Sequence, residues 1–264
     1  MSEPALEIES LSFSVRGAPI LRNISARIGH GETWSIIGAN GAGKSSLLKC
    51  LMRIHSGWSG RVQLFGRPLE SYSQRQLAQR VAYVPQPGGD QRFPYTVREF
   101  VRMGRYPYAG PLGAAHPGDK AAVDEAIARA DVGRFAARTF DTLSGGERQK
   151  VFIAAALAQQ GDILLLDEPT AFLDYRHQAE VFAILRAINR DTRTTIVAVT
   201  HDVNAALLAG GHVLALRKGE VAWSGPTRDL ACEKRLGRIF DARFRFLDDP
   251  ESGLRLVAPQ GAAQ

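Results

Sequence analysis

The glycine-rich segment 38–45 has the residue types and spacing of a phosphate-binding turn. Its sequence, GANGAGKS, fits the pattern G-x-x-x-x-G-K-[ST] and lies between an apolar run, residues 33–37, and a segment with helical periodicity. Glycines allow a tight turn with inward-pointing N–H groups, and the N-terminus of the following helix attracts anions. Lys44 is long enough to reach the β- and γ-phosphates of a nucleotide, and the Ser45 hydroxyl suits Mg²⁺. A chance glycine-rich turn is the alternative, but the strand–turn–helix setting favours nucleotide binding.

Two adjacent carboxylates, Asp167 and Glu168, follow the apolar run 163–166. In a parallel sheet, ligands gather at the carboxyl ends of the strands, so we expect these acids beside the phosphate-binding turn. Neighbouring strand residues point to opposite sides, which predicts different roles for the two. Asp167 would hold Mg²⁺ through water, and Glu168 would orient or deprotonate the attacking water. A solvated acid pair at a strand end is the alternative.

Two further polar residues follow predicted strands. Gln86 comes shortly after the run 81–84, where a glutamine can bind Mg²⁺ or position water. His201 follows the apolar run 194–199, and its place at a strand end predicts a contact to the γ-phosphate. The alternatives are a polar loop residue and a structural histidine.

The hydrophobic pattern predicts the elements that position these residues. Alternation over residues 6–28 predicts antiparallel strands, residues 87–160 are mostly helical, and residues 163–199 give strand, helix, strand, which implies a parallel sheet. We therefore expect an α/β fold: a P-loop NTPase (RecA-like) core, an N-terminal antiparallel β subdomain and an inserted α-helical subdomain. Residues 1–264 would form a single nucleotide-binding domain, with residues 87–160 as the helical subdomain and 225–264 as a C-terminal extension.

Composition narrows the class of protein. The 264 residues carry a formal charge of +6 from scattered Lys and Arg side chains, and no apolar stretch approaches the roughly 20 residues that span a bilayer. Any membrane role is therefore expected to depend on a partner. The N-terminus lacks a secretion-signal pattern. Cys50 and Cys232 lie outside metal-type pairs, so we expect buried, reduced thiols and a cytoplasmic protein.

Residues 143–149, LSGGERQ, resemble the signature sequence of the nucleotide-binding subunits of ABC transporters. The motifs occur in that family's order over residues 5–240, and AFLD, residues 171–174, is similar to the loop that crosses the family's dimer interface. The signature segment opens a helix, so its N–H groups would form a second anion site. The alternative is a simple helix cap with Ser144 as N-cap.

The resemblance implies an ATPase that uses Mg²⁺ and pairs head to tail with a second copy of itself. Ser144 and Gly146 of one copy would close over ATP held by the turn of the other. It further implies an integral membrane permease, indirectly a substrate-binding protein, no nucleic acid, and a peripheral place on the cytoplasmic face of the membrane. The ATP contacts it implies are Gly38, Asn40, Gly41, Ala42, Gly43, Lys44, Ser45, Ser46, Ser144, Gly145, Gly146, Glu147 and Asp174. The catalytic residues it implies are Glu168, His201 and Gln86, and the metal ligands Ser45, Gln86 and Asp167.

Residues 104–107, GRYP, resemble the helical subdomain of importers for iron–siderophore complexes, haem and cobalamin. In that group the helical subdomain receives a coupling helix of the membrane subunit, which makes residues 86–108 a candidate docking surface. Phe93, Tyr95 and Phe100 are its candidate apolar anchors. The alternative is an ordinary helix C-terminus closed by Gly104 and Pro107.

Two positions depart from the family's pattern. Val15, with Phe13 nearby, stands where the family usually has an aromatic residue that stacks on adenine, and Ala155 stands where relatives often carry arginine. Two other functions stay open: a soluble ABC ATPase acting on nucleic acid, which the basic charge would suit, and an exporter subunit. The absence of a coiled-coil insertion or second ATPase core disfavours the first, and the GRYP segment disfavours the second.

Overall fold

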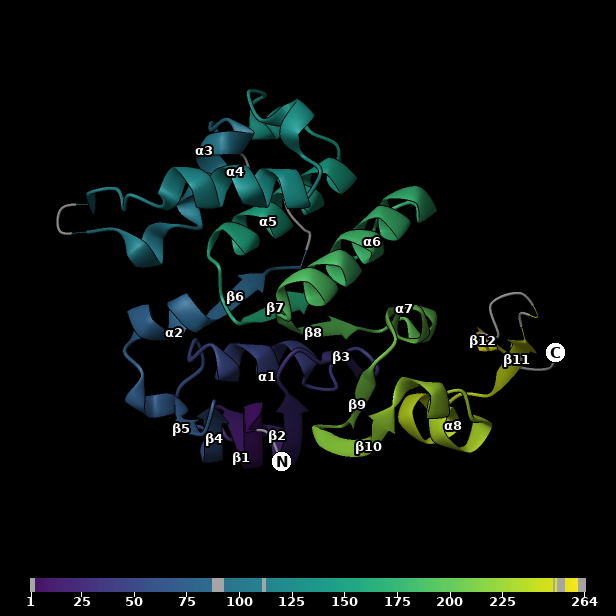
Figure 1. Ribbon diagram of the computed structural model, residues 1–264. Helices are drawn as coiled ribbons and strands as arrows, with labels where there is room; N and C mark the ends of the chain where they lie inside the picture. Colours follow the sequence, from purple (N-terminus) through teal and green to yellow (C-terminus); the bar gives the residue numbers. More distant parts are fainter. Residues whose placement is uncertain (1–2, 87–92, 111–112, 249, 251–254, 261–264) are drawn as a thin grey trace. The chain divides into compact units, whose positions relative to one another are not determined.

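The computed structural model describes residues 3–86, 93–110, 113–248, 250 and 255–260. Figure 1 labels the helices and strands of the chain, which divides into two compact units. Unit 1 comprises Met1–Leu69 and Val197–Gln264, and unit 2 comprises Glu70–Ile196. Unit 1 contains the phosphate-binding turn, whereas unit 2 contains the acid pair and the signature segment.

An antiparallel sheet opens unit 1. Its strands β1 (Pro4–Val15), β2 (Ala18–Gly29), β4 (Ser59–Leu64) and β5 (Arg67–Pro68) lie in the order β2-β1-β4-β5. Apolar residues that alternate along β1, among them Leu6 and Ile8, are buried, while Glu9 is exposed. The predicted antiparallel strands are thus confirmed, and period-two alternation is the reason they bury one face.

The strand that leads into the phosphate-binding turn, β3 (Thr33–Ile37), is buried from Trp34 onward. It pairs in parallel with β9 (His212–Arg217), which pairs antiparallel with β10 (Glu220–Pro226). Helix α1 (Lys44–Leu51) follows the turn, and α7 (Val203–Ala209) precedes β9. The predicted strand–turn–helix succession is therefore confirmed.

The C-terminal part of unit 1 has one helix, α8 (Glu233–Phe240), and an antiparallel pair, β11 (Phe244–Asp248) and β12 (Arg255–Pro259). Leu236 and Ile239 of α8 are buried in a cluster with Ile37 of β3. This packing attaches the C-terminal segment to the strand that carries the turn.

Unit 2 contains helix α2 (Gln74–Arg80) and the parallel strands β6 (Val81–Val84) and β7 (Ile163–Asp167). Helix α6 (Tyr175–Thr192) follows β7 and leads to β8 (Thr195–Thr200), within which the boundary to unit 1 falls. β7 is buried along its whole length, as expected of a strand inside a parallel sheet.

Three helices form a separate hydrophobic cluster in unit 2: α3 (Val97–Met103), α4 (Asp119–Arg129) and α5 (Gly145–Ala158). The 3₁₀ turns within the described residues include η1 (Leu69–Ser71), η2 (Tyr106–Tyr108), η4 (Gly133–Phe135), η5 (Phe140–Thr142) and η6 (Thr227–Asp229). The helical middle of the chain is confirmed from residue 93 onward, while residues 87–92 and 111–112 of the predicted segment lie outside the described part.

Two of the predicted docking anchors, Phe93 and Phe100, pack in this hydrophobic cluster. Phe100 is 8% exposed, and its ring stacks on Phe140 with 4.7 Å between centroids. Phe93 packs against the same cluster, 5.2 Å from Phe100 between centroids. The prediction that Phe100 is a surface anchor was wrong, because the three helices need large rings to fill the space between them. Phe93 is only partly buried, so its role as an anchor stays a prediction. Tyr95, at 42% exposure, stays on the surface.

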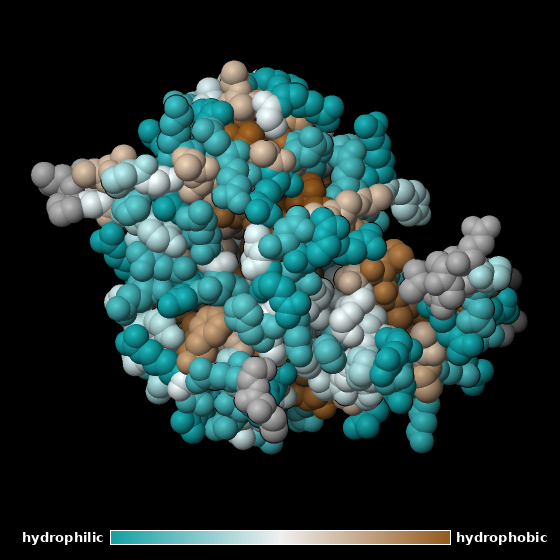
Figure 2. Space-filling model, viewed as in Figure 1, coloured by the Kyte–Doolittle hydropathy of each residue, from teal (hydrophilic) through white to brown (hydrophobic). Residues whose placement is uncertain are grey.

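The surface drawn in Figure 2 is mostly polar, and the two thiols differ in exposure. No helix among the described residues is long and apolar enough to cross a membrane. On the face drawn in Figure 2 most residues are hydrophilic, and the hydrophobic ones form small separate patches. Both cysteines are free; Cys50 is buried as expected, whereas Cys232 is partly exposed because it precedes a surface helix.

Candidate nucleotide site

The backbone of the phosphate-binding turn requires glycine at two positions. Gly38 has φ 151°, and a Cβ there would lie 2.3 Å from the carbonyl oxygen of Leu216. Gly43 has φ 99°, and its Cβ would lie 2.7 Å from Cδ2 of Leu21. Only a residue without a side chain fits both the left-handed backbone and these close approaches. The turn is therefore built against β2 and β9 of its own unit.

Lys44 lies inside this turn. It is 6% exposed, and its Nζ donates hydrogen bonds to the carbonyl oxygens of Gly38 at 2.8 Å and Ala39 at 3.2 Å. Ser45 and Ser46, in the first turn of α1, are half-buried, and Asn40 and Gly41 are exposed. Ala42 is buried, and its carbonyl accepts from the Gly219 N–H at 3.2 Å. The Lys44 ammonium thus lies next to an exposed loop and to the N-terminus of α1, which is the positive end of that helix. This arrangement suits a bound anion.

The acid pair sits at the carboxyl end of β7. Asp167 is 4% exposed and Glu168 is 7% exposed. Glu168 has φ 51°, a strained conformation for a residue with a side chain, and such strain concentrates at functional sites. The phenol of Tyr83 lies 3.5 Å from Oδ2 of Asp167, and burial first, then this carboxylate, raises the pKa of Tyr83 to about 12. Tyr83 therefore stays a neutral donor facing Asp167.

Gln86 and His201 hold the strand-end positions that the sequence predicts. Gln86 is exposed two residues beyond β6, in unit 2 with the acid pair. His201 is exposed directly after β8, in unit 1 with Lys44. Each unit therefore carries its own group of predicted site residues.

The signature segment forms the capped start of α5. The Ser144 hydroxyl accepts from the N–H of Glu147 at 3.3 Å, and Oε2 of Glu147 accepts from the N–H of Ser144 at 2.9 Å. The hydrogen bond from the backbone N–H of Ser144 lowers the pKa of the Glu147 carboxyl. Ser144 is therefore the N-cap of α5, as the alternative interpretation of the sequence predicted. Ser144 and Gly145 are also exposed, and no atom lies within 4 Å of a Cβ built at Gly145, so the helix tip is open to a ligand or partner.

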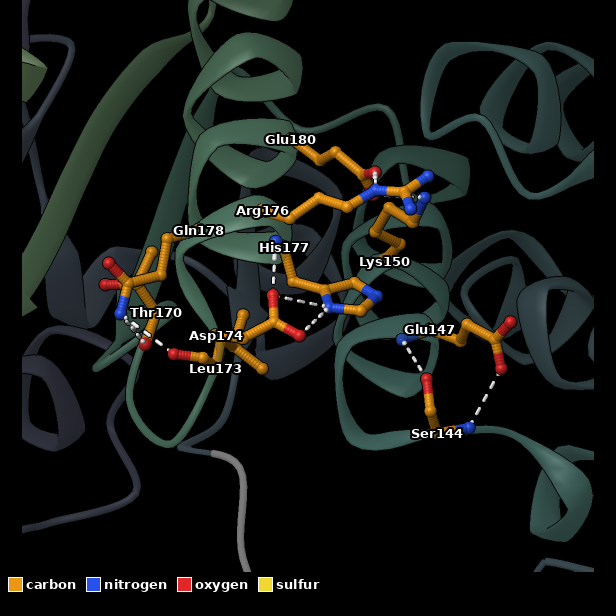
Figure 3. Close-up of polar contacts among 10 residues, drawn as sticks. All are labelled: Ser144, Glu147, Lys150, Thr170, Leu173, Asp174, Arg176, His177, Gln178 and Glu180. Carbon is orange, nitrogen blue, oxygen red and sulfur yellow. Dashed lines mark hydrogen bonds and ion pairs between the residues drawn. The ribbon is translucent and has the colours of Figure 1, made fainter.

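The loop after the acid pair ends at Asp174, the N-cap of α6. Oδ1 of Asp174 accepts from the His177 N–H at 2.8 Å (Figure 3). The His177 ring lies against Gly146 of the signature helix. Asp174 and the signature segment are thereby brought together within unit 2. The neighbouring Phe172 and Tyr175 are 88% and 91% exposed.

Sequence reasoning did not single out His177. The signal that could have found it is its spacing, because a residue three positions after an N-cap aspartate lies where its side chain can reach the cap. Its contact with Gly146, thirty-one positions earlier, could not be predicted from the neighbouring residues in the sequence.

A comparison with models of known families matches residues 21–171 to the ABC transporter family. The chain belongs to the ABC transporter family. Within that family the chain is an ATP-binding and ATP-hydrolysing protein, and the matched residues include its phosphate-binding turn, acid pair and signature segment.

Relatives in the ABC transporter family extend the match over nearly the whole chain. The hemin import ATP-binding protein HmuV of Streptomyces coelicolor is 41% identical over 94% of this chain and 88% of its own length. The ferric enterobactin transport ATP-binding protein FepC of Escherichia coli is 36% identical over 96% of this chain and 93% of its own. The solved structure of a metal-chelate type ABC transporter in an inward-facing conformation has a TM-score of 0.84 and 27% identity, covering 98% of both chains.

One of the two departures from the ABC transporter pattern, Val15 with Phe13 nearby, lies in unit 1. Phe13 is 6% exposed and its ring stacks on His55 at 4.8 Å between centroids, so it is occupied within the fold. Val15, at the end of β1, is 45% exposed but has no aromatic ring. Phe13 is therefore no candidate for stacking on adenine.

Proposed function

We propose that this chain is the ATP-hydrolysing subunit of an importer for a metal chelate: an iron complex, as siderophore or haem, or cobalamin. The observation that carries the proposal is the joint presence of the signature helix tip and the GRYP segment in a chain 36–41% identical to hemin and ferric enterobactin ATP-binding proteins. The named cargoes share one chemistry, a metal ion held by a large organic ligand. The names of these relatives favour import over the exporter and nucleic-acid alternatives.

ATP binding begins at the turn 38–45. Lys44 holds the β- and γ-phosphates once its ammonium exchanges the Gly38 and Ala39 carbonyls for phosphate oxygens, while backbone N–H groups from Asn40 to Ser46 surround the phosphates. Ser45, Asp167 and Gln86 provide hydroxyl, carboxylate and amide oxygens, a donor set that fits Mg²⁺. Mg²⁺ bound there would neutralise charge on the phosphates.

Hydrolysis depends on Glu168. Its carboxylate takes a proton from, or orients, the water that attacks the γ-phosphorus, and the bond to the bridging oxygen of ADP breaks. Gln86 positions the same water, and His201 contacts the γ-phosphate. The strained backbone of Glu168 supports a role for which its position is fixed.

In the proposed cycle, two copies of the chain close on bound ATP and separate after hydrolysis. Ser144, Gly145, Gly146, Glu147 and Asp174 of one copy complete the ATP site on the turn of the other, because the exposed start of α5 is a second anion site. ATP favours the closed pair by its contacts with both copies, and hydrolysis removes them.

The membrane partner would convert this closing into transport. An integral permease docks on residues 93–108, where Tyr95, Met103 and Tyr106 are 42%, 45% and 83% exposed. A substrate-binding protein acts indirectly. ATP is supplied inside the cell, so the chain would lie on the cytoplasmic face of the membrane.

The test uses the full-length chain in complex with the membrane subunit that co-purifies. Glu168→Gln should bind ATP like the unaltered chain but lose turnover by about a hundredfold or more. Lys44→Ala should weaken ATP binding itself, and Glu125→Gln, on the exposed face of α4, should change neither. ATPase activity of Glu168→Gln near the unaltered level would remove Glu168 from the base role. Uptake of a ferric siderophore, haem or cobalamin into vesicles would identify the cargo, and uptake of none would overturn the importer assignment.

A further inference from the structure

We propose that His177 is a positioning residue that ties the loop after the catalytic carboxylate to the signature helix, and so couples the two ATP sites of the closed pair. The inference rests on the proposed function, in which one copy contributes to both sites. His177 is the third residue of α6, and Figure 3 shows its ring between Asp174 and the start of α5.

One side of the ring is bound to Asp174. Nδ1 of His177 lies 2.9 Å from both carboxylate oxygens, and the backbone N–H of His177 donates to Oδ1 at 2.8 Å. These hydrogen bonds lower the pKa of Asp174, which therefore stays ionised. An ionised carboxylate only accepts hydrogen bonds, so Nδ1 must carry a proton. Asp174 thus fixes both the orientation and the tautomer of the imidazole.

The other side of the ring lies on the signature helix. A Cβ built at Gly146 would come within 2.2 Å of Cδ2 and 2.3 Å of Cγ of His177. The imidazole thus occupies the space that any side chain at Gly146 would need. Any side chain at Gly146 would displace the histidine of α6 from this position, in addition to any effect on a contact with phosphate.

The loop between Glu168 and Asp174 is held along its length. The Ala171 N–H donates to the Glu168 carbonyl at 3.1 Å, and Nε2 of Gln178 donates to the Leu173 carbonyl at 3.0 Å. In our proposal, a displacement of Asp174 moves this loop and with it the backbone that carries Glu168. Through His177, the same displacement reaches the start of α5.

A second tie joins the same two helices one turn further on. Nζ of Lys150 lies 2.9 Å from Oε2 of Glu180, and Arg176 lies 3.2 Å from Oε1 of the same carboxylate. The Lys150 side chain is only 2% exposed, whereas that of Glu180 is 29% exposed, so the pair is partly shielded from water. The pair keeps α5 and α6 together, which leaves His177 to set the position of the loop against the helix tip.

The consequence appears in the head-to-tail pair. Glu168 acts on the ATP bound by its own chain, whereas Ser144 and Gly146 contact the ATP bound by the other. A contact that joins Asp174 to Gly146 therefore joins one ATP site to the other. Loss of it should reduce turnover and cooperativity between the sites while leaving ATP binding to a single chain intact.

The experiment compares variants of His177 in the complex with the co-purifying membrane subunit. His177→Phe keeps a ring but removes the donor, His177→Asn keeps a donor near the place of Nδ1, and His30→Ala is a control on an exposed histidine of unit 1. We expect His177→Phe to lower kcat about tenfold and the Hill coefficient for ATP towards one, with KM and the single-chain ATP affinity within about twofold. His177→Asn should recover part of both losses, and His30→Ala should lose neither. His177→Phe with unaltered kcat and Hill coefficient would overturn the proposal.

A second measurement needs no variant. In the ¹⁵N spectrum of the labelled, unaltered chain, His177 should show a protonated Nδ1, and a neutral ring protonated only at Nε2 would overturn the proposal even if the variants fail to fold. Failure of the proposed function looks different: the unaltered complex would then not hydrolyse ATP, or Lys44→Ala would bind ATP normally. If only the inference about His177 fails, the unaltered complex still hydrolyses ATP and Lys44→Ala still weakens ATP binding.

Discussion

The Arg105 guanidinium and the Asp119 carboxylate form a buried ion pair, with Nε of Arg105 2.8 Å from Oδ1 of Asp119. The same guanidinium donates to the Ala158 carbonyl at 2.7 Å and lies over the Tyr108 ring at 3.9 Å from its centroid. Arg105 therefore connects the end of α3 to the start of α4 and the end of α5. The arginine of the GRYP segment is a structural residue of the helical cluster, whichever cargo the segment marks.

Gly104, the glycine of the GRYP segment, lies close to the backbone of Ala155 in α5. A Cβ at Gly104 would lie 2.0 Å from the Ala155 carbonyl oxygen. Gly104 is the C-cap of α3, in agreement with the alternative interpretation of the sequence, but its φ of −58° is one that any residue adopts. It allows α3 and α5 to approach, because no side chain fits between them.

Removal of the Arg105 side chain should destabilise the protein. Arg105 and Asp119 are 4% and 13% exposed, and Arg105→Ala leaves the carboxylate with one charged partner fewer. The expected loss is about 3 kcal/mol of unfolding free energy, measured by urea denaturation. Arg129→Ala is the matched control, since its pair with Glu125 is 32% and 54% exposed and should contribute less than about 1 kcal/mol. Equal losses in the two variants would contradict the structural role of Arg105.

The same pair predicts a dependence of stability on pH. The hydrogen bond from Arg105 lowers the pKa of Asp119, so folding favours the ionised carboxyl. The contribution is present above the unfolded pKa of about 3.9 and is lost as pH falls through the lower folded value. The stability difference between the unaltered chain and Asp119→Asn should therefore be largest near neutral pH and shrink below about pH 4. A difference that stays constant down to about pH 3 would show that charge is not its source.

The glycines of the phosphate-binding turn should differ in their tolerance of alanine. Gly38→Ala introduces a Cβ 2.3 Å from the Leu216 carbonyl oxygen, whereas a Cβ at Gly41 has no atom within 4 Å. Gly41 has φ 78°, so Gly41→Ala carries only backbone strain of about 1 to 2 kcal/mol. We expect Gly38→Ala to lower the melting temperature more than Gly41→Ala. Similar melting temperatures would mean that β9 moves aside readily.

The elements that carry the site were predictable where the hydrophobic period is strong. The buried run of β7, the alternation of β1 and the apolar face of α6 formed by Val181, Leu185 and Ile188 all fix their elements locally. Long-range contacts were not predictable. Phe100 is buried by Phe140 forty positions later, and His177 meets Gly146 only because α5 and α6 pack together. A single sequence records which side chains are apolar, but not which helix each of them will face.

The two thiols should differ sharply in reactivity. Burial raises the pKa of Cys50 to about 11, so about one Cys50 thiol in a thousand is ionised at about pH 8, and the residue is inaccessible in α1. The backbone amide of Arg235, aided by that of Lys234, lowers the pKa of Cys232 at the start of α8. A maleimide should therefore modify one thiol quickly in the native chain and the second only in denaturant, as followed by mass spectrometry. Cys232→Ser should abolish the fast step, and fast labelling that persists in this variant would show that α1 opens under native conditions.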